Sequence, residues 1–185
     1  MAEERKIILQ RDDLGRVISR LAHEIVEKAA TANELVLIGI RSRGVHLARR
    51  LARKFHEIAN VAPPVGVIDV TPYRDDRNPP PGLPAIGAFE VQVTVEDKIV
   101  VLIDDVIFRG RTIRAAMEAV ERLGQPKRIL VAVLVDRGAR ELPIRADFVG
   151  KNVDVQDGQR VNVLLEESDG IDQVIVADWQ GRNAN

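Results

Sequence analysis

Cysteine is absent from this sequence of 185 residues, aromatic residues are rare, and no apolar run is long. The lack of cysteine excludes disulfides, thiolate nucleophiles and zinc or iron–sulfur centres held by cysteine. Aromatic residues make up only 3% of the chain, which disfavours a single-stranded nucleic-acid binder that works by base stacking. The longest apolar run, residues 129–135, is far shorter than the roughly 18 residues that cross a membrane.

The chain also lacks an excess of either charge. Its 27 basic and 28 acidic residues leave a formal net charge of −1, so any nucleic-acid or membrane site must come from local clustering. The three histidines have no spacing typical of a metal-binding pair. The first residues are charged rather than apolar, so we expect no signal peptide, no membrane partner and a cytoplasmic protein.

Helix-like and strand-like patterns alternate along the chain. Apolar residues recur at spacings of three and four over residues 14–29, which predicts an amphipathic helix with Asp12 or Asp13 as its N-cap. Short segments that are apolar on both faces predict buried parallel strands over residues 35–40, 65–70, 99–103 and 129–135. We therefore predict one α/β domain over residues 1–185, with a mainly parallel twisted sheet flanked by helices.

Two segments interrupt this alternation. Seven of the nine prolines fall between Pro63 and Pro84, so we expect residues 72–90 to form a flexible loop that serves as a lid. From about residue 136 the pattern changes to short strands, near residues 161–165 and 174–177. This change predicts a small accessory subdomain, the hood, over about residues 136–185.

The most informative segment is residues 100–112 (VVLIDDVIFRGRT), in which a buried strand leads to two carboxylates and a turn that contains glycine. Ligands of open α/β sheets bind at the carboxyl ends of strands. A helix start with free N–H groups, Gly110 and the Thr112 hydroxyl is an anion site, most naturally for phosphate. Asp104 and Asp105 would repel a phosphate, so we expect them to face ribose hydroxyls or a magnesium-bound sugar.

This segment resembles the phosphoribosyl pyrophosphate (PRPP) motif of type I phosphoribosyltransferases. Other segments resemble the PyrR family, whose members are bifunctional pyrimidine operon attenuators and uracil phosphoribosyltransferases. The resemblance runs from about residue 12 to residue 151, and its last segment is long enough to be specific to this family. The segments that carry it are residues 19–24, 39–44, 73–76, 133–138 and 140–152.

The resemblance implies the type I phosphoribosyltransferase fold and a reaction in which uracil displaces pyrophosphate from PRPP to form UMP. Magnesium would be bound with PRPP, with no separate protein metal site. The implied catalytic residues are Asp104 and Asp105 at the ribose and Arg43 at the pyrophosphate. The implied substrate-binding residues are Arg41, Ser42 and Gly44 in the turn, Tyr73 and Arg74 in the lid, Val106, Ile107, Phe108, Arg109, Gly110, Arg111 and Thr112 around the 5′-phosphate, and Val135, Asp136 and Arg137 at the base.

The resemblance also implies binding of a messenger RNA hairpin from a pyrimidine operon, favoured by UMP or UTP. The expected RNA contacts are Arg20, His23, Arg140, Arg145 and Lys151. Four basic and three acidic residues lie between residues 136 and 151, a net charge of only +1, so local charge does not establish this function. We expect a homodimer or larger assembly, because pairing two such faces would make a better phosphate-contacting surface.

Three features depart from the family pattern. Arg109 stands where the family usually has Thr or Ser, Ala139 stands where it usually has His, and residues 153–158 lack a Ser/Thr-rich stretch. Arg109 leaves an alternative, a nucleotide-sensing RNA-binding attenuation regulator with little or no transferase activity. The other two departures weaken the expected RNA function more than the enzyme. A phosphoribosyltransferase for another base is a third hypothesis, because base recognition through backbone groups leaves no side-chain pattern.

Overall fold

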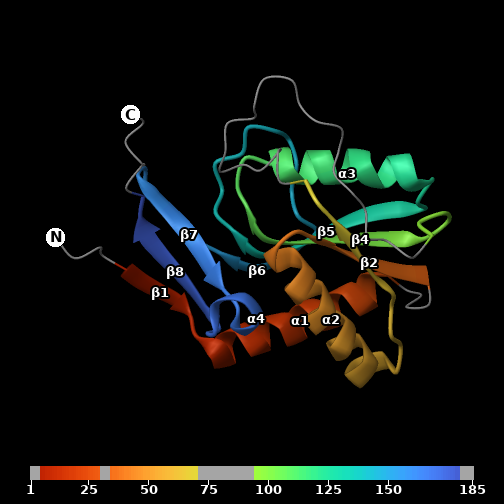
Figure 1. Ribbon diagram of the computed structural model, residues 1–185, viewed down its shortest axis with the longest axis horizontal. Helices are drawn as coiled ribbons and strands as arrows, with labels where there is room; N and C mark the ends of the chain where they lie inside the picture. Colours follow the sequence, from red (N-terminus) through yellow and green to blue (C-terminus); the bar gives the residue numbers. More distant parts are fainter. Residues whose placement is uncertain (1–4, 30–33, 71–93, 180–185) are drawn as a thin grey trace.

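The computed structural model describes residues 5–29, 34–70 and 94–179 as a central sheet with helices on both faces and a smaller sheet beside it (Figure 1). The central sheet has the strand order β3-β2-β4-β5-β6, and all its neighbouring strands are parallel. Its strands are β2 (Leu35–Ile40), β3 (Val65–Ile68), β4 (Ile99–Ile107), β5 (Arg128–Asp136) and β6 (Phe148–Asn152). The α/β fold predicted from the sequence is confirmed.

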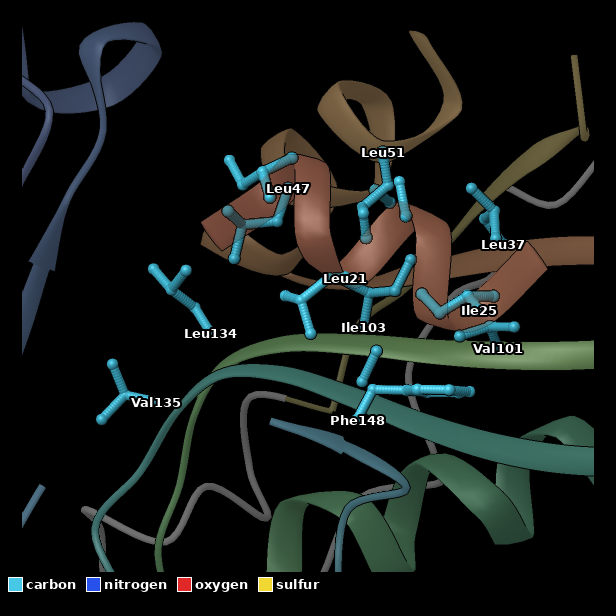
Figure 2. Close-up of a cluster of buried hydrophobic side chains, with 14 of the residues drawn as sticks. Leu21, Ile25, Leu37, Leu47, Leu51, Val101, Ile103, Leu134, Val135 and Phe148 are labelled. Carbon is cyan, nitrogen blue, oxygen red and sulfur yellow. The ribbon is translucent and has the colours of Figure 1, made fainter. Parts of the chain in front are cut away.

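Helices cover both faces of this sheet. Helices α1 (Arg11–Ala29) and α2 (Arg43–Ala59) lie on one face, and α3 (Arg111–Leu123) lies on the other (Figure 1). Leu21 of α1 and Leu51 of α2 point toward Ile103 of β4 in the first core cluster (Figure 2). Leu102 of the same strand belongs to a second cluster with Val120 of α3. Because β4 is buried on both faces, its sequence is apolar at successive positions. Within the described ranges, no helix is long and apolar enough to span a membrane.

The start of α1 differs from the predicted cap. The helix begins at Arg11, so Asp12 and Asp13 lie inside its first turn. The Asp13 carboxylate accepts a hydrogen bond from the Gln10 backbone N–H at 3.1 Å. The side chain therefore reaches back to the residue before the helix, as the third helical residue does in a capping box.

The hood is a three-stranded antiparallel sheet that includes the first strand of the structure. It consists of β1 (Arg5–Leu9), β7 (Gln159–Leu164) and β8 (Gln173–Asp178) in the order β1-β8-β7, with α4 (Glu166–Asp169) between β7 and β8. The predicted boundary near residue 136 differs from this arrangement, because β6 pairs with β5 in the central sheet. The buried side chain of Phe148 anchors β6 in the main core.

Ion pairs join the hood to α1 and α2. Four acidic residues of the 166–172 segment face basic side chains: Glu166 pairs with Arg11, Asp169 with Arg43, and Glu167 and Asp172 with Arg50. The Arg50 guanidinium lies 2.6 Å from a Glu167 carboxylate oxygen and 2.7 Å from an Asp172 carboxylate oxygen. The Arg50 side chain therefore holds both ends of the segment around α4.

We predict that this junction makes the free energy of unfolding decrease as the pH becomes acidic. Hydrogen bonding from Arg50 lowers the pKa of Glu167 below its ordinary 4.5. Burial alone would raise the pKa of Asp172, but hydrogen bonds from Arg50 and the Glu166 N–H outweigh it and lower that pKa below 3.8. Carboxylates with a lowered pKa in the folded state stabilise it fully above their ordinary pKa, and lose that contribution as pH falls through the folded value.

Urea unfolding between about pH 6 and about pH 3 measures this effect. The free energy of unfolding should fall as the pH drops below 4.5, the higher of the two ordinary values. The variant Arg50→Met should show a shallower fall, because its carboxylates have lost the partner that lowers their pKa. The same pH dependence in both proteins would contradict the prediction.

Candidate functional site

The strand order reverses between β2 and β4, and the end of the sheet at this reversal is called the crevice below. From β2 the chain passes through α2 to β3 on one side, and from β4 it passes through α3 to β5 on the other. The two connecting helices lie on opposite faces of the sheet (Figure 1). Open α/β sheets bind ligands at such a reversal, beyond the carboxyl ends of the strands. The turn of residues 41–44 and the two β4 carboxylates lie at this end.

Strand β4 is longer than predicted and carries both carboxylates within it. Its pairing with β2 ends at Ile103, opposite Gly39, whereas its pairing with β5 continues to Ile107. Asp104 is therefore the first residue after the stretch paired with β2, and it is only 7% exposed. The Asp104 carboxylate accepts a hydrogen bond from the Asp105 N–H at 2.9 Å, and the Asp105 carboxylate accepts one from the Val106 N–H at 2.9 Å.

Two glycines let the first turn of α2 rest on the ends of β2 and β4. A Cβ atom on Gly44 would lie 2.3 Å from the Ile103 carbonyl oxygen and 3.3 Å from the Asp104 Cα. A Cβ atom on Gly39 would lie 2.5 Å from the Val45 Cα. No side chain fits at either distance, so the backbones touch directly. This contact places the 41–44 turn, which contains a cis peptide bond between Arg41 and Ser42, beside Asp104.

The two arginines of this turn have acidic neighbours. The Arg41 Nε atom lies 3.7 Å from an Asp69 carboxylate oxygen just beyond β3. The Arg43 guanidinium binds the Asp169 carboxylate of the hood through Nη2 at 2.9 Å and Nε at 3.3 Å. Arg43 lies at the start of α2, in the turn that follows β2. Its partner is 126 positions away in the chain, so no local pattern indicated this contact.

The predicted phosphate loop lies between β4 and α3. Gly110 caps α3 with a φ of 93°, a left-handed conformation that favours glycine, and Thr112 in the first turn is buried. The Arg109 Nε atom lies 3.1 Å from one Glu141 oxygen, and Arg111 pairs with the other. The Glu141 backbone N–H also donates to the Arg109 carbonyl at 3.1 Å. Glu141 therefore ties the loop to the segment after β5, a role that sequence reasoning missed.

The predicted base-binding residues are Val135 and Asp136 at the end of β5 and Arg137 directly after it, and Arg137 meets the phosphate loop. The Arg137 guanidinium lies 3.9 Å from the centre of the Phe108 ring. Its Nε atom is buried without a hydrogen-bond partner in the described part of the chain. Burial, and then the charge of Arg109, lower the pKa of Arg137. A partly buried guanidinium near a second one is stabilised by an oxygen-rich or anionic ligand, so this corner of the crevice suits a group of that kind.

Arg140, which the sequence placed among the RNA contacts, instead faces inward. Its guanidinium donates to three carbonyl oxygens, those of Phe108 at 2.7 Å and of Gly138 and Ile144 at 3.0 Å, and it pairs with Asp136. Its side chain is only 18% exposed. These bonds use every nitrogen of the guanidinium, so Arg140 holds the base segment against the phosphate loop and has little surface for RNA.

The other proposed RNA contacts lie on the surface. Arg20 of α1 donates to the Gly150 carbonyl at 2.6 Å and pairs with Glu24, so it also fastens α1 to β6. His23, Arg145 and Lys151 are exposed. Helix α1 packs on β6, which brings Arg20 and His23 to the side of the molecule that carries Lys151.

Two of the predicted lid residues fall outside the described ranges. Tyr73 and Arg74, assigned to the lid, lie outside the described residues. Within residues 5–29, 34–70 and 94–179, no group of three histidine, aspartate or glutamate side chains is arranged to hold a metal ion.

The fold and the family model agree on the class of protein. Residues 4–164 match the model described as phosphoribosyl transferase domain. A hypoxanthine phosphoribosyltransferase of Trypanosoma cruzi has a TM-score of 0.73 at 18% identity, covering 95% of this chain and 97% of that one. A hypoxanthine-guanine phosphoribosyltransferase of Bacillus anthracis has a TM-score of 0.70 at 18% identity, covering 95% and 99%. The chain therefore carries a phosphoribosyltransferase domain of the type I fold.

Comparison with curated proteins narrows this class to one family. The bifunctional protein PyrR of Pelotomaculum thermopropionicum is 49% identical over 178 residues, which cover 96% of this chain and 98% of that protein. The bifunctional protein PyrR of Streptomyces coelicolor is 49% identical over 176 residues, covering 94% and 90%. The chain belongs to the PyrR family, and the family predicted from the sequence is confirmed.

We predict that Gly44→Ala damages the crevice. The added methyl group would displace the start of α2 from β4, which should lower the free energy of unfolding by about 1–3 kcal/mol and weaken PRPP binding. Gly15→Ala is the matched control, because a Cβ atom at Gly15 in α1 meets nothing within 4 Å. It should be neutral or stabilising by up to about 1 kcal/mol. Urea unfolding and PRPP titration measure both effects; equal behaviour of the two variants would contradict the prediction.

Proposed function

We propose that this protein is a uracil phosphoribosyltransferase that converts uracil and PRPP to UMP and pyrophosphate, and that it also regulates pyrimidine genes through RNA. The observation that carries the first half is the meeting of four segments at one crevice. These segments are the 41–44 turn, the β4 carboxylates, the phosphate loop and the base segment after β5. Membership of the PyrR family supports both halves.

The residues of the crevice suit transfer at the anomeric carbon. As pyrophosphate departs, positive charge develops on the ribose, and the carboxylates of Asp104 and Asp105 are the nearby groups that stabilise it. Arg43 and the N-terminus of α2 bind the departing pyrophosphate. The N-terminus of α3 and its glycine-containing loop bind the 5′-phosphate. Most of the catalysis is then positioning and electrostatics, with no covalent intermediate on the protein.

Magnesium belongs to this proposal as part of bound PRPP. It would offset the negative charge of the pyrophosphate, and the carboxylate oxygens of Asp104 and Asp105 are of the kind that it prefers as protein ligands. Asp104 and Asp105 fit this chemistry because they are successive carboxylates near the end of β4, beyond its last residue paired with β2. The residues described contain no larger acidic cluster for an independent metal site.

Arg109 bears on the alternative of a regulator without transferase activity. Its side chain pairs with Glu141, which also pairs with Arg111, so these three side chains keep a net positive charge at the edge of the loop. The loop keeps its helix start and Gly110, although Arg109 replaces the hydroxyl residue usual in the family. The relatives are called bifunctional, which favours the enzyme over the regulator alone.

We predict that the double variant Asp104→Asn, Asp105→Asn loses transferase activity by about a hundredfold or more, because the ribose loses both charges that stabilise the transition state. The assay is UMP formation from labelled uracil with PRPP and magnesium. The control is Asp97→Asn, an exposed aspartate before the opposite end of β4. Full activity in a folded double variant would overturn the assignment, and no activity in the unaltered protein would favour the regulator.

The RNA half of the proposal places the contact surface on α1 and β6. Arg20, His23 and Lys151 supply the basic and polar groups, and a homodimer or larger assembly would bring two such surfaces together. Basic side chains bind the RNA phosphates whatever the base sequence is. The shape of the RNA and its unpaired bases must therefore supply the specificity. Because PRPP and operon messenger RNA both occur in the cytoplasm, we place the protein there.

We predict that Lys151→Ala weakens binding of the chain's own operon leader RNA by several-fold and reduces its salt dependence, because one phosphate contact is lost. Transferase activity should be unchanged. Arg140→Ala should lower transferase activity more than RNA affinity, because the hydrogen bonds of Arg140 hold the base segment. Filter binding and the UMP assay separate the two effects. An unchanged RNA affinity in Lys151→Ala would remove β6 from the proposed surface.

A further inference from the structure

One face of α2 contacts the hood, and one of these contacts reaches the candidate site. Arg43, His46 and Arg50 are three and four positions apart, so they share a face of the helix. His46 meets Ser168 at 2.9 Å, and Arg50 meets Glu167 and Asp172. Arg43 differs from the other two because it is the first residue of α2, in the turn beside Asp104. Its hood partner is Asp169.

The geometry of this pair fixes the plane of the Arg43 guanidinium. The Asp169 carboxylate takes the edge formed by Nε and Nη2, with Nη2 at 2.9 Å from one oxygen and 3.2 Å from the other. A carboxylate on two nitrogens of a planar guanidinium restricts its rotation, whereas a single contact does not. The side chains of Arg43 and Asp169 are 29% and 20% exposed, so the pair is partly shielded from water.

Asp169 is itself held in place. One of its carboxylate oxygens accepts a hydrogen bond from the Leu165 backbone N–H at 2.9 Å, at the start of α4. Burial alone would raise the pKa of Asp169, but this hydrogen bond and the Arg43 charge outweigh it and lower the pKa. The carboxylate is therefore ionised at neutral pH, and a hood backbone group holds it independently of Arg43.

The opposite edge of the guanidinium remains available to a ligand. Arg43 donates through Nε and Nη2, and within the described part of the chain its Nη1 atom has no partner. An arginine has five N–H donors, two of them on Nη1. These two donors match the oxygens of a pyrophosphate group, which arginine binds well.

We propose that Asp169 is a positioning residue for Arg43, which it holds so that the Nη1 donors serve the pyrophosphate group of PRPP; this rests on the function proposed above. The hood thereby contributes to the substrate site without touching substrate. Removal of the carboxylate leaves Arg43 with its charge but frees it to rotate. Pyrophosphate binding should therefore weaken even though the net positive charge of the site rises.

The test is calorimetric titration of the full chain with magnesium pyrophosphate, which requires no uracil turnover. Asp169→Asn should raise the Kd for pyrophosphate by about tenfold, the lower end of the loss found when an orienting partner is removed from a ligand-binding side chain. The KM for PRPP should rise in parallel, and the KM for uracil should stay unchanged. Glu167→Gln is the control, because it removes a hood contact to Arg50 instead of Arg43. It should leave the Kd for pyrophosphate and the KM for PRPP unchanged.

A second variant separates positioning from general structural support. In an Arg43→Ala background, Asp169→Asn should add no further loss, because the residue through which it acts is gone. Tighter or unchanged pyrophosphate binding in Asp169→Asn alone would overturn the inference, as would an equal loss in Glu167→Gln. An unaltered protein that binds pyrophosphate but forms no UMP would refute the proposed uracil activity and leave the Asp169 comparison decisive.

Discussion

The direct contact between the first turn of α2 and the end of β4 is the constraint on which the site depends. Because Gly44 has no side chain, its backbone lies against the Ile103 carbonyl and the Asp104 Cα. The same contact brings the positive end of a helix next to two carboxylates. Groups that bind pyrophosphate and groups that hold ribose thus lie within the reach of one small molecule, as transfer between them requires.

The remaining parts of the crevice are joined by side chains that do not themselves face the substrate. Glu141 links the phosphate loop to the base segment, Arg140 links the base segment to Phe108, and Asp169 links the hood to Arg43. Each pairs a charge with an opposite charge or a carbonyl, which lowers the cost of partial burial. Residues that look like free surface charges in the sequence are here structural supports.

Much of the molecule could be predicted from local patterns. The buried strands and the amphipathic helices were apparent because their periods depend on neighbours a few positions away. The order of carboxylates, Gly110 and Thr112 predicted a phosphate site for the same reason, since strand, loop and helix start follow one another directly. Two features were not apparent from local patterns: the place of β6 in the central sheet and the inward position of the Arg140 side chain. Both depend on partners that local patterns do not reveal, since β6 pairs with β5 and Arg140 bonds to Phe108.

The sequence by itself determined the fold class, the phosphate motif and the family, because each is written in contiguous residues. Only the tertiary structure decided which charges meet. The pairing of Arg43 with Asp169 spans 126 positions in the chain. The pairing of Arg109 with Glu141 joins the loop after β4 to the segment after β5. An ion pair between residues far apart in the chain leaves no repeating pattern in the sequence. Its partners meet only because the folded backbone brings them together. Packing of α2 on β4 and of the hood on α2 makes that choice.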